Sequence, residues 1–384
     1  MERRGAGMER RALQKVALFV PSMTAGGAEK MFRRLAAGFA GAGLSVDLVL
    51  SEATGPLLEG VAGSVRVVDL ECKRILASSG PLARYLDSAK PDALISTLHY
   101  ANIMAVIARS RAAASPFLIL REANTMSLDA GNSPELRMRL IPKLARVFYP
   151  RADVIAANSK GVADDLVETI GIPRSMVRVI HNPTWSDDLL PLMNEPVSHP
   201  WFADKQVPVV VSIGRLFPSK GFDLLIEAVC EVQRHRPVRL VIFGEGEERP
   251  KLEQLINDRQ AAGFVSLPGY AANPYAYLAR ADLFVLSSHW EGLPNSLIEA
   301  LGCGLTVVAT DCPSGPREIL DMPQRGRGRF GALISCGDYQ AMAAAISEEL
   351  DNRRDQEAQR QQARRFSADR AVASYLALMR AGVH

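Results

Sequence analysis

Short apolar runs alternate with helical patterns along almost the whole chain, and this alternation is the feature that most restricts the fold. Runs of strand length that are separated by helix-length segments are typical of βαβ units, which build parallel sheets covered by helices on both faces. In the first half, strands are predicted at residues 15–20, 44–50, 65–70, 93–97, 117–121, 154–158 and 177–181. Between the first two, Met31, Leu35 and Phe39 lie four apart, which predicts a helix over residues 28–40.

A break in the alternation divides the chain. Residues 182–206 contain four prolines and show no clear period. Beyond them, strands are predicted at residues 208–213, 239–243, 264–267, 283–286, 305–310 and 332–335, with helices at 220–235, 248–262, 273–280 and 296–301. A length of 384 residues suits two domains. We therefore expect an α/β protein with two Rossmann-like, doubly wound domains, residues 1–190 and 191–365, facing each other across a cleft, with a last helix (366–384) packed back on the first domain.

The most specific motif follows a predicted strand in the second half. It reads Glu291, Gly292, Leu293, Pro294, Asn295, Ser296, Leu297, Ile298 and Glu299. We expect Asn295 to cap a helix that starts at Ser296, and Gly292 to let the backbone approach a ligand. Amides at a helix N-terminus suit phosphate or sugar oxygens. Glu291 is placed to accept hydrogen bonds from sugar hydroxyls, and Glu299 from a ribose. The alternative is a capped helix with two solvated glutamates.

Further candidate ligand-binding residues follow other predicted strands of the second half. Gly214, Arg215 and Lys220 lie in the segment Gly-Arg-Leu-Phe-Pro-Ser-Lys. A planar arginine and a lysine can together neutralise a diphosphate, whereas the alternative is a turn with two surface cations. Gly244 starts a glycine-rich turn that lacks the Gly-Lys-Ser/Thr of a P-loop. Tyr270 follows the next strand, where backbone groups can hold a base.

The first half has its own candidates at predicted strand ends. Gly26 and Gly27 join the first strand to the first helix and permit close approach of a diphosphate or sugar, although they do not form G-x-G-x-x-G. His99 follows the strand at residues 93–97, where it can contact a sugar hydroxyl or serve a structural role. Candidates for the acceptor side are Asn102, Arg121, Glu122 and Asn124.

Metal chemistry is not expected. The chain contains no Asp-x-Asp motif, and its five cysteines include no C-x-x-C pair. We therefore expect no metal and no cofactor, and fixed cations with backbone dipoles would stabilise a leaving diphosphate.

The distribution of charge is uneven. Residues 1–190 contain 24 Lys and Arg against 19 Asp and Glu, whereas the remainder contains 21 against 23. The excess includes Arg3, Arg4, Arg10, Arg11, Arg33, Arg34, Arg137, Arg139, Lys143, Arg146 and Arg151. These residues either form a solvated surface or bind an anionic partner such as a lipid headgroup or a pyrophosphate-linked acceptor. Nucleic acid is not expected, since no recognition motif accompanies the charge.

The expected location is the cytoplasm, with contact to the inner face of the cytoplasmic membrane. No apolar run approaches the ~18 residues of a membrane span. The apolar run at residues 16–20 is too short for the core of a secretory signal.

Together these motifs resemble the bacterial glycosyltransferases of family 4, which have the GT-B fold. The resemblance extends from Gly26-Gly27 to residues 365–367. It is most specific in residues 291–320, which match the E-x7-E region of the family and the stretch after it. The chain is most similar to enzymes that extend undecaprenyl-diphosphate-linked saccharides.

The resemblance also implies roles for individual residues. Arg215 and Lys220 match the residues that bind the donor diphosphate, Glu299 the one that binds the donor ribose, and Glu291 the one that contacts the donor sugar. His99 lies where many members have a histidine that contacts the sugar. The implied reaction is a retaining, metal-free transfer of a hexose or N-acetylhexosamine from a nucleotide sugar, with UDP favoured, to a saccharide or polyprenyl-diphosphate-linked acceptor.

Two alternatives remain at this point. The first is a nucleotide-sugar 2-epimerase on the same fold, which needs acid–base groups around the sugar, although most of the six histidines lie outside the candidate loops. The second is a non-catalytic sugar- or nucleotide-binding protein, for which a diphosphate-binding Arg–Lys pair has no use.

Overall fold

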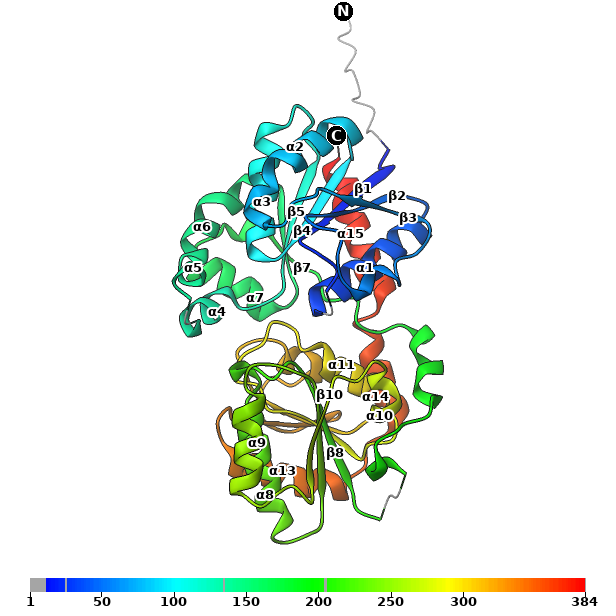
Figure 1. The fold of residues 1–384 in the computed structure, drawn as a ribbon, viewed down its shortest axis with the longest axis vertical. Coiled ribbons are helices and arrows are strands. Elements are labelled where there is room, and N and C mark those ends of the chain that lie inside the picture. Colours follow the sequence, from blue (N-terminus) through cyan, green and yellow to red (C-terminus); the bar gives the residue numbers. More distant parts are fainter. Residues whose placement is uncertain (1–11, 25, 134, 204–205, 384) are drawn as a thin grey trace, which may run out of the picture. The chain divides into compact units, whose positions relative to one another are not determined.

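The protein consists of two compact units (Figure 1). The structure is a computed structural model that describes residues 12–24, 26–133, 135–203 and 206–383. Unit 1 comprises Met1–Pro183 and Ala368–His384, and unit 2 comprises Thr184–Ser367. The boundary predicted at residue 190 therefore lies inside unit 2. The reason is Trp185, which is 1% exposed and belongs to the hydrophobic core of unit 2.

Unit 1 is built on a seven-stranded sheet in the order β3-β2-β1-β4-β5-β6-β7. Its neighbouring strands pair in parallel. The strands are β1 (Lys15–Val20), β2 (Ser45–Leu50), β3 (Val65–Asp69), β4 (Ala93–Thr97), β5 (Phe117–Glu122), β6 (Val154–Ala157) and β7 (Val177–Val179). The α-helices are α1 (Gly27–Gly41), α2 (Ser79–Ala89), α3 (His99–Arg111), α4 (Met126–Asn132), α5 (Leu136–Arg139), α6 (Ile141–Phe148), α7 (Lys160–Asp164) and α15 (Ala368–Gly382). The predicted parallel sheet is confirmed.

Both faces of this sheet are buried. On β1, Ala17 and Phe19 point into a core shared with α2, α3 and α6, whereas Leu18 and Val20 point into a second core shared with α1 and α15. Because successive side chains of a strand alternate between faces, a strand covered on both sides must be apolar throughout. This burial explains why inner strands such as β1 and β6 appear in the sequence as apolar runs, whereas the largely exposed edge strand β3 contains Arg66 and Asp69.

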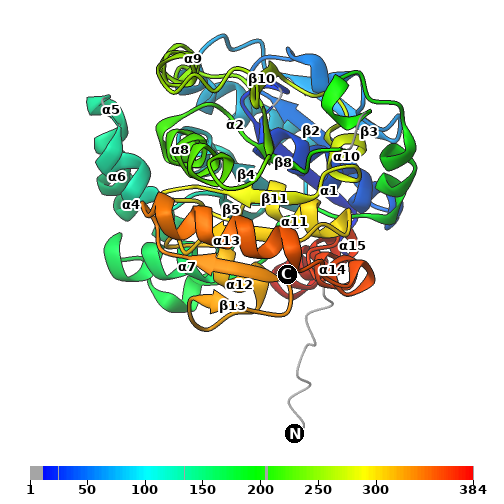
Figure 2. The ribbon, with the colours of Figure 1, turned by 90° about the horizontal axis from the view of Figure 1, so that it is seen from below.

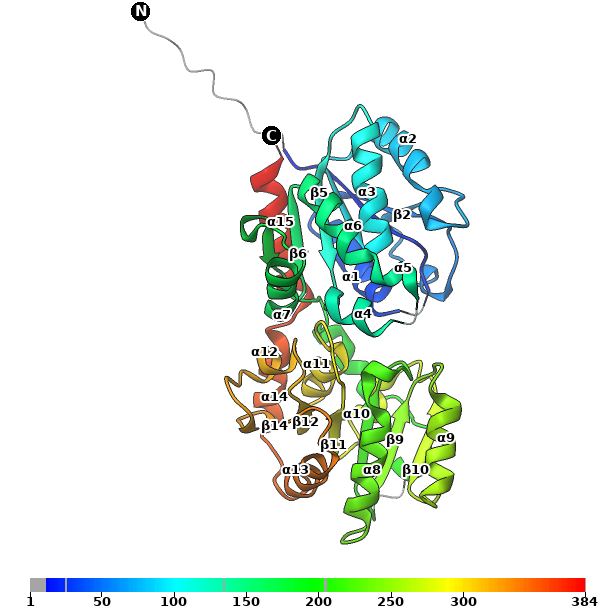
Figure 3. The ribbon, with the colours of Figure 1, turned by 90° about the vertical axis from the view of Figure 1, so that its left-hand side faces the viewer.

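Helix α15 returns to unit 1 after the chain has completed unit 2, and lies beside α1 (Figures 1 and 3). The rings of Phe39 on α1 and Tyr375 on α15 pack edge to face, with centroids 6.3 Å apart. A Cβ atom on Gly38 would lie 2.4 Å from a methyl group of Val372. The small residue on α1 therefore allows the two helices to approach closely.

Unit 2 contains a second seven-stranded sheet, in the order β10-β9-β8-β11-β12-β14-β13. Its strands are β8 (Val209–Ile213), β9 (Arg239–Phe243), β10 (Val265–Gly269), β11 (Leu283–Leu286), β12 (Val307–Thr310), β13 (Gly326–Arg327) and β14 (Gly331–Ile334). The α-helices are α8 (Phe222–Gln233), α9 (Arg249–Asp258), α10 (Pro274–Leu278), α11 (Asn295–Gly302), α12 (Pro316–Leu320), α13 (Tyr339–Asp351) and α14 (Gln356–Arg364). Only the pairing of β13 with β14 is antiparallel among the described strand pairs of this sheet. The two-residue β13 was not predicted, because it is too short to show a period.

The helices of unit 2 again cover both faces of the sheet. One core contains residues of α8, α9 and α13, and α8 and α13 lie side by side (Figures 2 and 3). The other core contains residues of α10, α11 and α14 together with Trp185. No helix in the described part of the chain is long and apolar enough to span a membrane.

Replacement of Gly302 by alanine should destabilise unit 2. Gly302 is the last residue of α11, and a Cβ atom there would lie 2.2 Å from the ring of Trp185. Overpacking against a buried ring costs about 1–3 kcal/mol. Because Trp185, Trp201 and Trp290 all belong to unit 2, tryptophan fluorescence during urea unfolding should report a lower midpoint for Gly302→Ala.

The matched control is Gly263→Ala, because no atom lies within 4 Å of a Cβ at that position. Equal urea midpoints for the two variants would contradict the close packing of α11 on Trp185.

Candidate functional site

In each sheet the strand order changes direction at one place. That place lies between β1 and β4 in unit 1 and between β8 and β11 in unit 2. In open α/β sheets, ligands bind beyond the carboxyl ends of the strands at such switch points. The segments that directly follow these four strands contain the candidates Gly26, Gly27, His99, Arg215 and Glu291. The topology thus gathers candidates within each unit.

The structure joins two of the candidates of unit 2 directly. Lys220 Nζ lies 2.5 Å from Glu291 Oε1, although the residues are 71 positions apart. The same carboxylate oxygen accepts a hydrogen bond from Ser288 Oγ at 2.6 Å. The side chains of Lys220 and Glu291 are 20% and 11% exposed. The pair is therefore held by the protein but accessible to a ligand, with a cation suited to phosphate and a carboxylate suited to sugar hydroxyls.

The backbone before α8 explains how Lys220 reaches this position. The residues Pro218–Lys220 form a short 3₁₀ turn, and Gly221 follows with a left-handed φ of 57°. A Cβ atom on Gly221 would lie 2.4 Å from Ser287 O, so only glycine lets the two loops touch. Ser287 Oγ also donates a hydrogen bond to Lys220 O at 2.7 Å. Consequently α8 begins at Phe222, and Lys220 lies in the loop rather than in a helix as predicted.

Arg215 lies on the surface beside this loop. Its side chain is exposed, and its guanidinium carbon lies 4.6 Å from the centre of the Phe217 ring. Stacking on an aromatic ring limits the conformations of an arginine without using its N–H donors. Arg215 can therefore present those donors to an anion.

The loops after β8, β9 and β10 are hydrogen-bonded to one another. Gly244 N–H donates to Gly269 O at 2.9 Å, and a Cβ atom on Gly244 would lie 1.8 Å from Gly214 O. Arg249, at the end of the same glycine-rich segment, donates to Gly244 O at 3.3 Å and to the carboxylate of Glu245. Gly214 and Gly244 thus serve loop packing, whereas Tyr270 is 56% exposed at the end of β10.

The start of α11 differs from the prediction. The helix begins at Asn295, with Pro294 in the capping position, and no side chain caps it. Asn295 does not cap the helix, because its Oδ1 accepts a hydrogen bond from Thr184 Oγ1 at 2.9 Å. The amide of Leu297 donates to Pro294 O at 3.2 Å and is not available to a ligand. Ser296 is partly exposed at the first turn.

The segment before α11 is packed tightly. Gly292, Leu293 and Pro294 are buried. Ser314 Oγ donates to Gly292 O at 2.7 Å, and a Cβ atom on Gly315 would lie 2.4 Å from Pro294 Cδ. The loop between Glu291 and α11 therefore has little freedom to move, which favours a fixed arrangement of its polar groups.

Glu299 makes a contact separate from that of Glu291. Tyr275 OH donates to Glu299 Oε1 at 3.2 Å, and the Tyr275 ring packs edge to face on Trp185 at a centroid distance of 6.4 Å. The sequence did not identify Tyr275 or Ser288. Their only signal was their position, since each closely follows a strand of the sheet.

His99 in unit 1 is paired with a buried carboxylate. Its Nδ1 lies 3.1 Å from Glu122 Oε2, and the side chains are 14% and 1% exposed. Burial lowers the pKa of His99, but the negative charge of Glu122 outweighs it and raises the pKa above its usual value. Burial likewise opposes ionisation of Glu122, whereas His99, Tyr149 and Asn102 hold its pKa below the usual range. Both shifts favour an imidazolium paired with a carboxylate.

A strained residue places His99 at the start of α3. Leu98 has φ 75° and ψ 135°, which is unusual for a bulky side chain. Such a conformation costs about 1–3 kcal/mol and is found mostly at functional sites. It turns the chain from β4 directly into the helix, so that His99 stays at the carboxyl end of the strand.

Two residues predicted on the acceptor side support His99 instead. Asn102 is 0% exposed and Glu122 is 1% exposed. Asn102 Nδ2 donates to Glu122 Oε1 at 2.7 Å, and Tyr149 OH donates to the same oxygen. Tyr149 was not identified, because it lies far from any strand end in the sequence. Being buried, these groups can act on a ligand only through His99.

The other two acceptor-side candidates differ from each other in exposure. Arg121 is 2% exposed and donates to Thr97 Oγ1 at 3.1 Å and to Asn182 Oδ1 at 2.5 Å. Asn124 is exposed and donates to Asp129 Oδ2 at 2.9 Å. Asn124 is therefore the member of the predicted group that lies on the surface.

The glycine pair of unit 1 lies at a helix N-terminus that already has an anion. Gly26 precedes α1, and Gly27 is its first residue. A Cβ atom on Gly26 would lie 2.2 Å from Glu29 Oε2, and Thr24 Oγ1 donates to Glu29 Oε1 at 2.9 Å. A diphosphate bound here would have to displace the Glu29 carboxylate.

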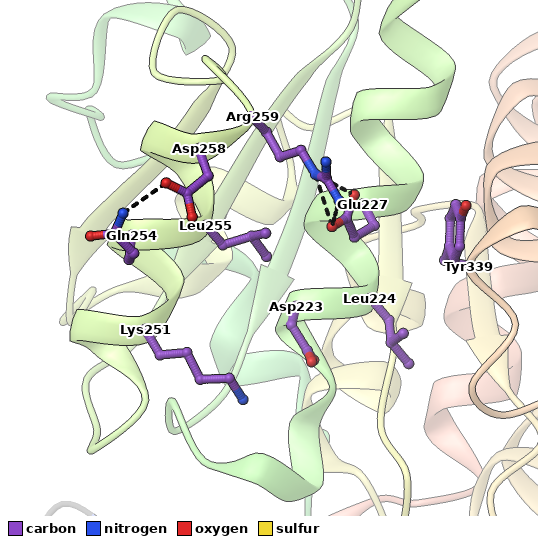
Figure 4. A pocket seen from close by; sticks show the side chains of 9 residues that line it. All are labelled: Asp223, Leu224, Glu227, Lys251, Gln254, Leu255, Asp258, Arg259 and Tyr339. Atoms are coloured by element: carbon purple, nitrogen blue, oxygen red, sulfur yellow. Dashed lines mark hydrogen bonds and ion pairs between the residues drawn. The ribbon is translucent and has the colours of Figure 1, made fainter.

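A hollow of about 580 Å³ on unit 2 is lined by side chains of α8, α9 and Tyr339 (Figure 4). Glu227 and Arg259 form an ion pair in it, at 2.7 Å. Its described lining includes none of the predicted site residues. Shape alone therefore does not identify the functional site, because the candidate polar side chains gather at the strand ends instead.

Comparison with known proteins places both units in sequence families. Residues 26–183 match the family described as "Glycosyl transferase 4-like domain", and residues 195–366 match "Glycosyl transferases group 1". The chain is 31% identical over 263 residues to an uncharacterized glycosyltransferase of Methanocaldococcus jannaschii, which covers 64% of this chain and 62% of the relative.

A second relative is the N-acetylgalactosamine-N,N'-diacetylbacillosaminyl-diphospho-undecaprenol 4-alpha-N-acetylgalactosaminyltransferase of Campylobacter jejuni. The chain is 33% identical to it over 209 residues, which is 54% of each protein. The matched segments thus span little more than half of the length of these relatives.

The fold is shared with solved structures. The Anabaena protein HepE in complex with UDP and glucose matches with a TM-score of 0.74 over 95% of this chain and 100% of that one, at 21% identity. This likeness shows that the two proteins share a fold of two Rossmann-like domains.

The Glu122→Gln variant should lower the pKa of His99. The substitution keeps the shape of the side chain but removes the charge that favours the imidazolium. An NMR titration should therefore show the His99 ring losing its proton at lower pH than in the wild type. His199 of unit 2, whose pKa is lowered by burial, serves as the internal control and should titrate as it does in the wild type. An unchanged His99 titration would contradict the pairing.

Proposed function

We propose that this chain, which belongs to the glycosyltransferases through the family matches of residues 26–183 and 195–366, transfers a hexose or N-acetylhexosamine from a nucleotide diphosphate sugar. The proposed acceptor is a saccharide or a lipid-linked saccharide. The observation that carries the proposal is the contact between Lys220 and Glu291, which puts a cation and a carboxylate side by side at the switch point of the second sheet. UDP is the nucleotide that we favour.

In this proposal the cations of unit 2 bind the diphosphate. Lys220 leaves its contact with Glu291 in part and donates to a phosphate oxygen, while Arg215 adds its planar donors from the surface. A diphosphate bridging two sugars carries two negative charges, so that one lysine and one arginine match it. Electrostatic support of a leaving group of this kind is usually the largest protein contribution to the rate.

The two glutamates bind different parts of the donor. Glu291 accepts hydrogen bonds from hydroxyls of the transferred sugar, and its Ser288 contact holds the carboxylate in place when Lys220 moves to the phosphate. Glu299 accepts from the ribose hydroxyls, and its contact with Tyr275 fixes the direction of the carboxylate. Constrained carboxylates of this kind discriminate between donors that have the matching hydroxyls and donors that lack them, because a carboxylate left without a hydrogen-bond partner is costly.

We further propose a retaining mechanism. The acceptor hydroxyl oxygen bonds to the anomeric carbon on the face from which the nucleotide diphosphate departs. The bond from that carbon to the diphosphate oxygen breaks, and the hydroxyl proton passes to the departing phosphate. No protein nucleophile is needed. His99 contacts the sugar as a charged donor, since Glu122 holds its imidazolium.

The proposed acceptor is a saccharide carried on a lipid diphosphate or a growing cell-surface glycan. The relative from Campylobacter jejuni is named as acting on a diphospho-undecaprenol-linked saccharide. The excess of basic residues in the first half of the chain suits an acceptor that carries the negative charge of a diphosphate.

Binding of UDP should raise the melting temperature, because a ligand that binds only the folded state stabilises it by mass action. We expect a larger shift with UDP and UDP-sugars than with GDP or ADP. Lys220→Ala should abolish most of the shift. Glu299→Ala should remove the preference for UDP over 2′-deoxy-UDP, because the Glu299 carboxylate is the group that we propose to bind the 2′-hydroxyl of the ribose. The measurement is a thermal-shift titration.

The matched control is Lys251→Ala, which removes another lysine of unit 2 that pairs with a glutamate, at 2.9 Å from Glu248. It should keep the wild-type shift. No shift with any nucleotide would contradict a donor site, and acceptor-independent conversion of the sugar without release of UDP would favour the 2-epimerase.

The transfer should proceed without a divalent metal. The chain has no Asp-x-Asp motif, and the described residues include no group of three or more His, Cys, Asp or Glu placed to hold an ion. A metal chelator should therefore leave the rate of acceptor-dependent UDP release within about twofold of the untreated rate, since two fixed cations serve the diphosphate. Full loss that Mg²⁺ restores would contradict this proposal.

A further inference from the structure

Helices α5 and α6 follow one another in unit 1 (Figure 1), and exposed apolar side chains lie along both of them. Leu136, Leu140, Leu144 and Val147 are 73%, 46%, 36% and 55% exposed. Their spacing of four, four and three residues puts them on one face of a helix. Leu140, between the two helices, keeps helical angles of φ −86° and ψ −16°, so the face is nearly continuous. We call these four residues the apolar stripe.

The opposite face of α6 already packs on the protein. Ile141 and Ala145 are 1% and 0% exposed and belong to the core that α6 shares with α3. The apolar stripe is therefore not needed to hold α6 in place. Four large apolar side chains on one exposed helix face indicate an interaction surface.

The charge around the apolar stripe indicates its partner. Residues 135–151 contain five cations and one acid, a net charge of +4. The cations are all exposed: Arg137, Arg139, Lys143, Arg146 and Arg151. The acid, Glu135, pairs with Arg137 at 2.6 Å. A protein partner would need an acidic rim around an apolar groove, whereas anionic lipid offers negative headgroups above an apolar interior over any area.

We propose that α5 and α6 form a membrane-binding surface, on which the apolar stripe enters the interface of an anionic lipid layer and the surrounding cations contact the headgroups. A helix of this kind lies in the plane of the interface, with its apolar face buried by about 5–10 Å. Arg3, Arg4, Arg10 and Arg11, which the sequence included in the basic excess, lie outside the described residues.

The surface is connected to the candidate site of the same unit. Tyr100 OH donates a hydrogen bond to Arg137 O at 3.3 Å, and Tyr100 follows His99 in α3. A lipid-linked acceptor held in the membrane would thus be presented near the end of α3 that carries His99. This last step rests on the proposed function, whereas the membrane-binding surface itself does not.

Co-sedimentation of the full chain with phosphatidylcholine vesicles, with and without phosphatidylglycerol, tests the proposal. The wild type should bind the anionic vesicles, and more weakly as salt is raised. Leu136→Ser should weaken binding about tenfold, since a leucine that enters the lipid on binding is replaced by a polar side chain. Lys143→Gln should weaken it about fivefold, through loss of one cation near the headgroups.

Matched controls come from the same unit. Leu76, which is 62% exposed, and Lys73, which is also exposed, lie in or next to the 3₁₀ turn Ile75–Ala77 that precedes α2. Leu76→Ser and Lys73→Gln should bind vesicles as the wild type does. Equal losses in these controls would overturn the assignment of the surface to α5 and α6.

Two further outcomes would overturn the proposal. One is binding that falls with Lys143→Gln but not with Leu136→Ser, because the apolar stripe would then stay outside the lipid. The other is a dimer that dissociates with Leu136→Ser while vesicle binding is unchanged, because the stripe would then join two copies of the chain. Sedimentation velocity detects the dimer. The UDP-induced thermal shift of each variant, measured in parallel, shows that the variant is folded and reports the donor site independently.

Discussion

Parallel strand pairing is the constraint on which both units depend. Parallel neighbours cannot be joined by a tight turn, so the chain returns over a face of the sheet, usually as a helix, before the next parallel strand. The parallel strands of each sheet therefore all end at one edge, and residues that are distant in sequence meet in the loops there. Lys220 follows β8 and Glu291 follows β11, and the 2.5 Å contact between them exists because these strands are neighbours in the sheet. The same constraint places His99, after β4, next to the loop that follows β1.

Patterns that depend on local burial could be predicted from the sequence, whereas contacts over long separations could not. The inner strands are apolar runs because both of their faces are covered, and nearly all the strands lie where the sequence predicted them. Asn295 shows the opposite case. It has the residue type of a helix cap, but Thr184, 111 positions away, takes its side-chain oxygen. Likewise Asn102 and Glu122 have the chemistry of ligand-binding residues, and only the packing of Tyr149 and α3 around them shows that they are interior.

The two ion pairs at the strand ends differ in how much of each is exposed, and this difference suggests different uses. Lys220 and Glu291 remain partly open to solvent, so a ligand can take over either partner without leaving a buried charge behind. Glu122 is buried, and its partners are His99, Asn102 and Tyr149. A ligand therefore cannot reach its carboxylate, which remains paired with His99. The first pair suits exchange with an incoming diphosphate and sugar. The second suits a fixed charge that orients one imidazole, because breaking a buried pair is costly.

Helix α15 has a consequence for the order in which the protein acquires its structure during synthesis. The core on one face of the first sheet includes Val372, Tyr375 and Met379, which the ribosome adds only after every residue of unit 2. Unit 2 is continuous in sequence and can complete its core as soon as it emerges. Unit 1, although its strands are made first, must wait with Phe39 and its neighbours uncovered. The usual rule that the amino-terminal domain finishes folding first is therefore reversed, and the nascent chain carries an apolar surface that a chaperone can recognise.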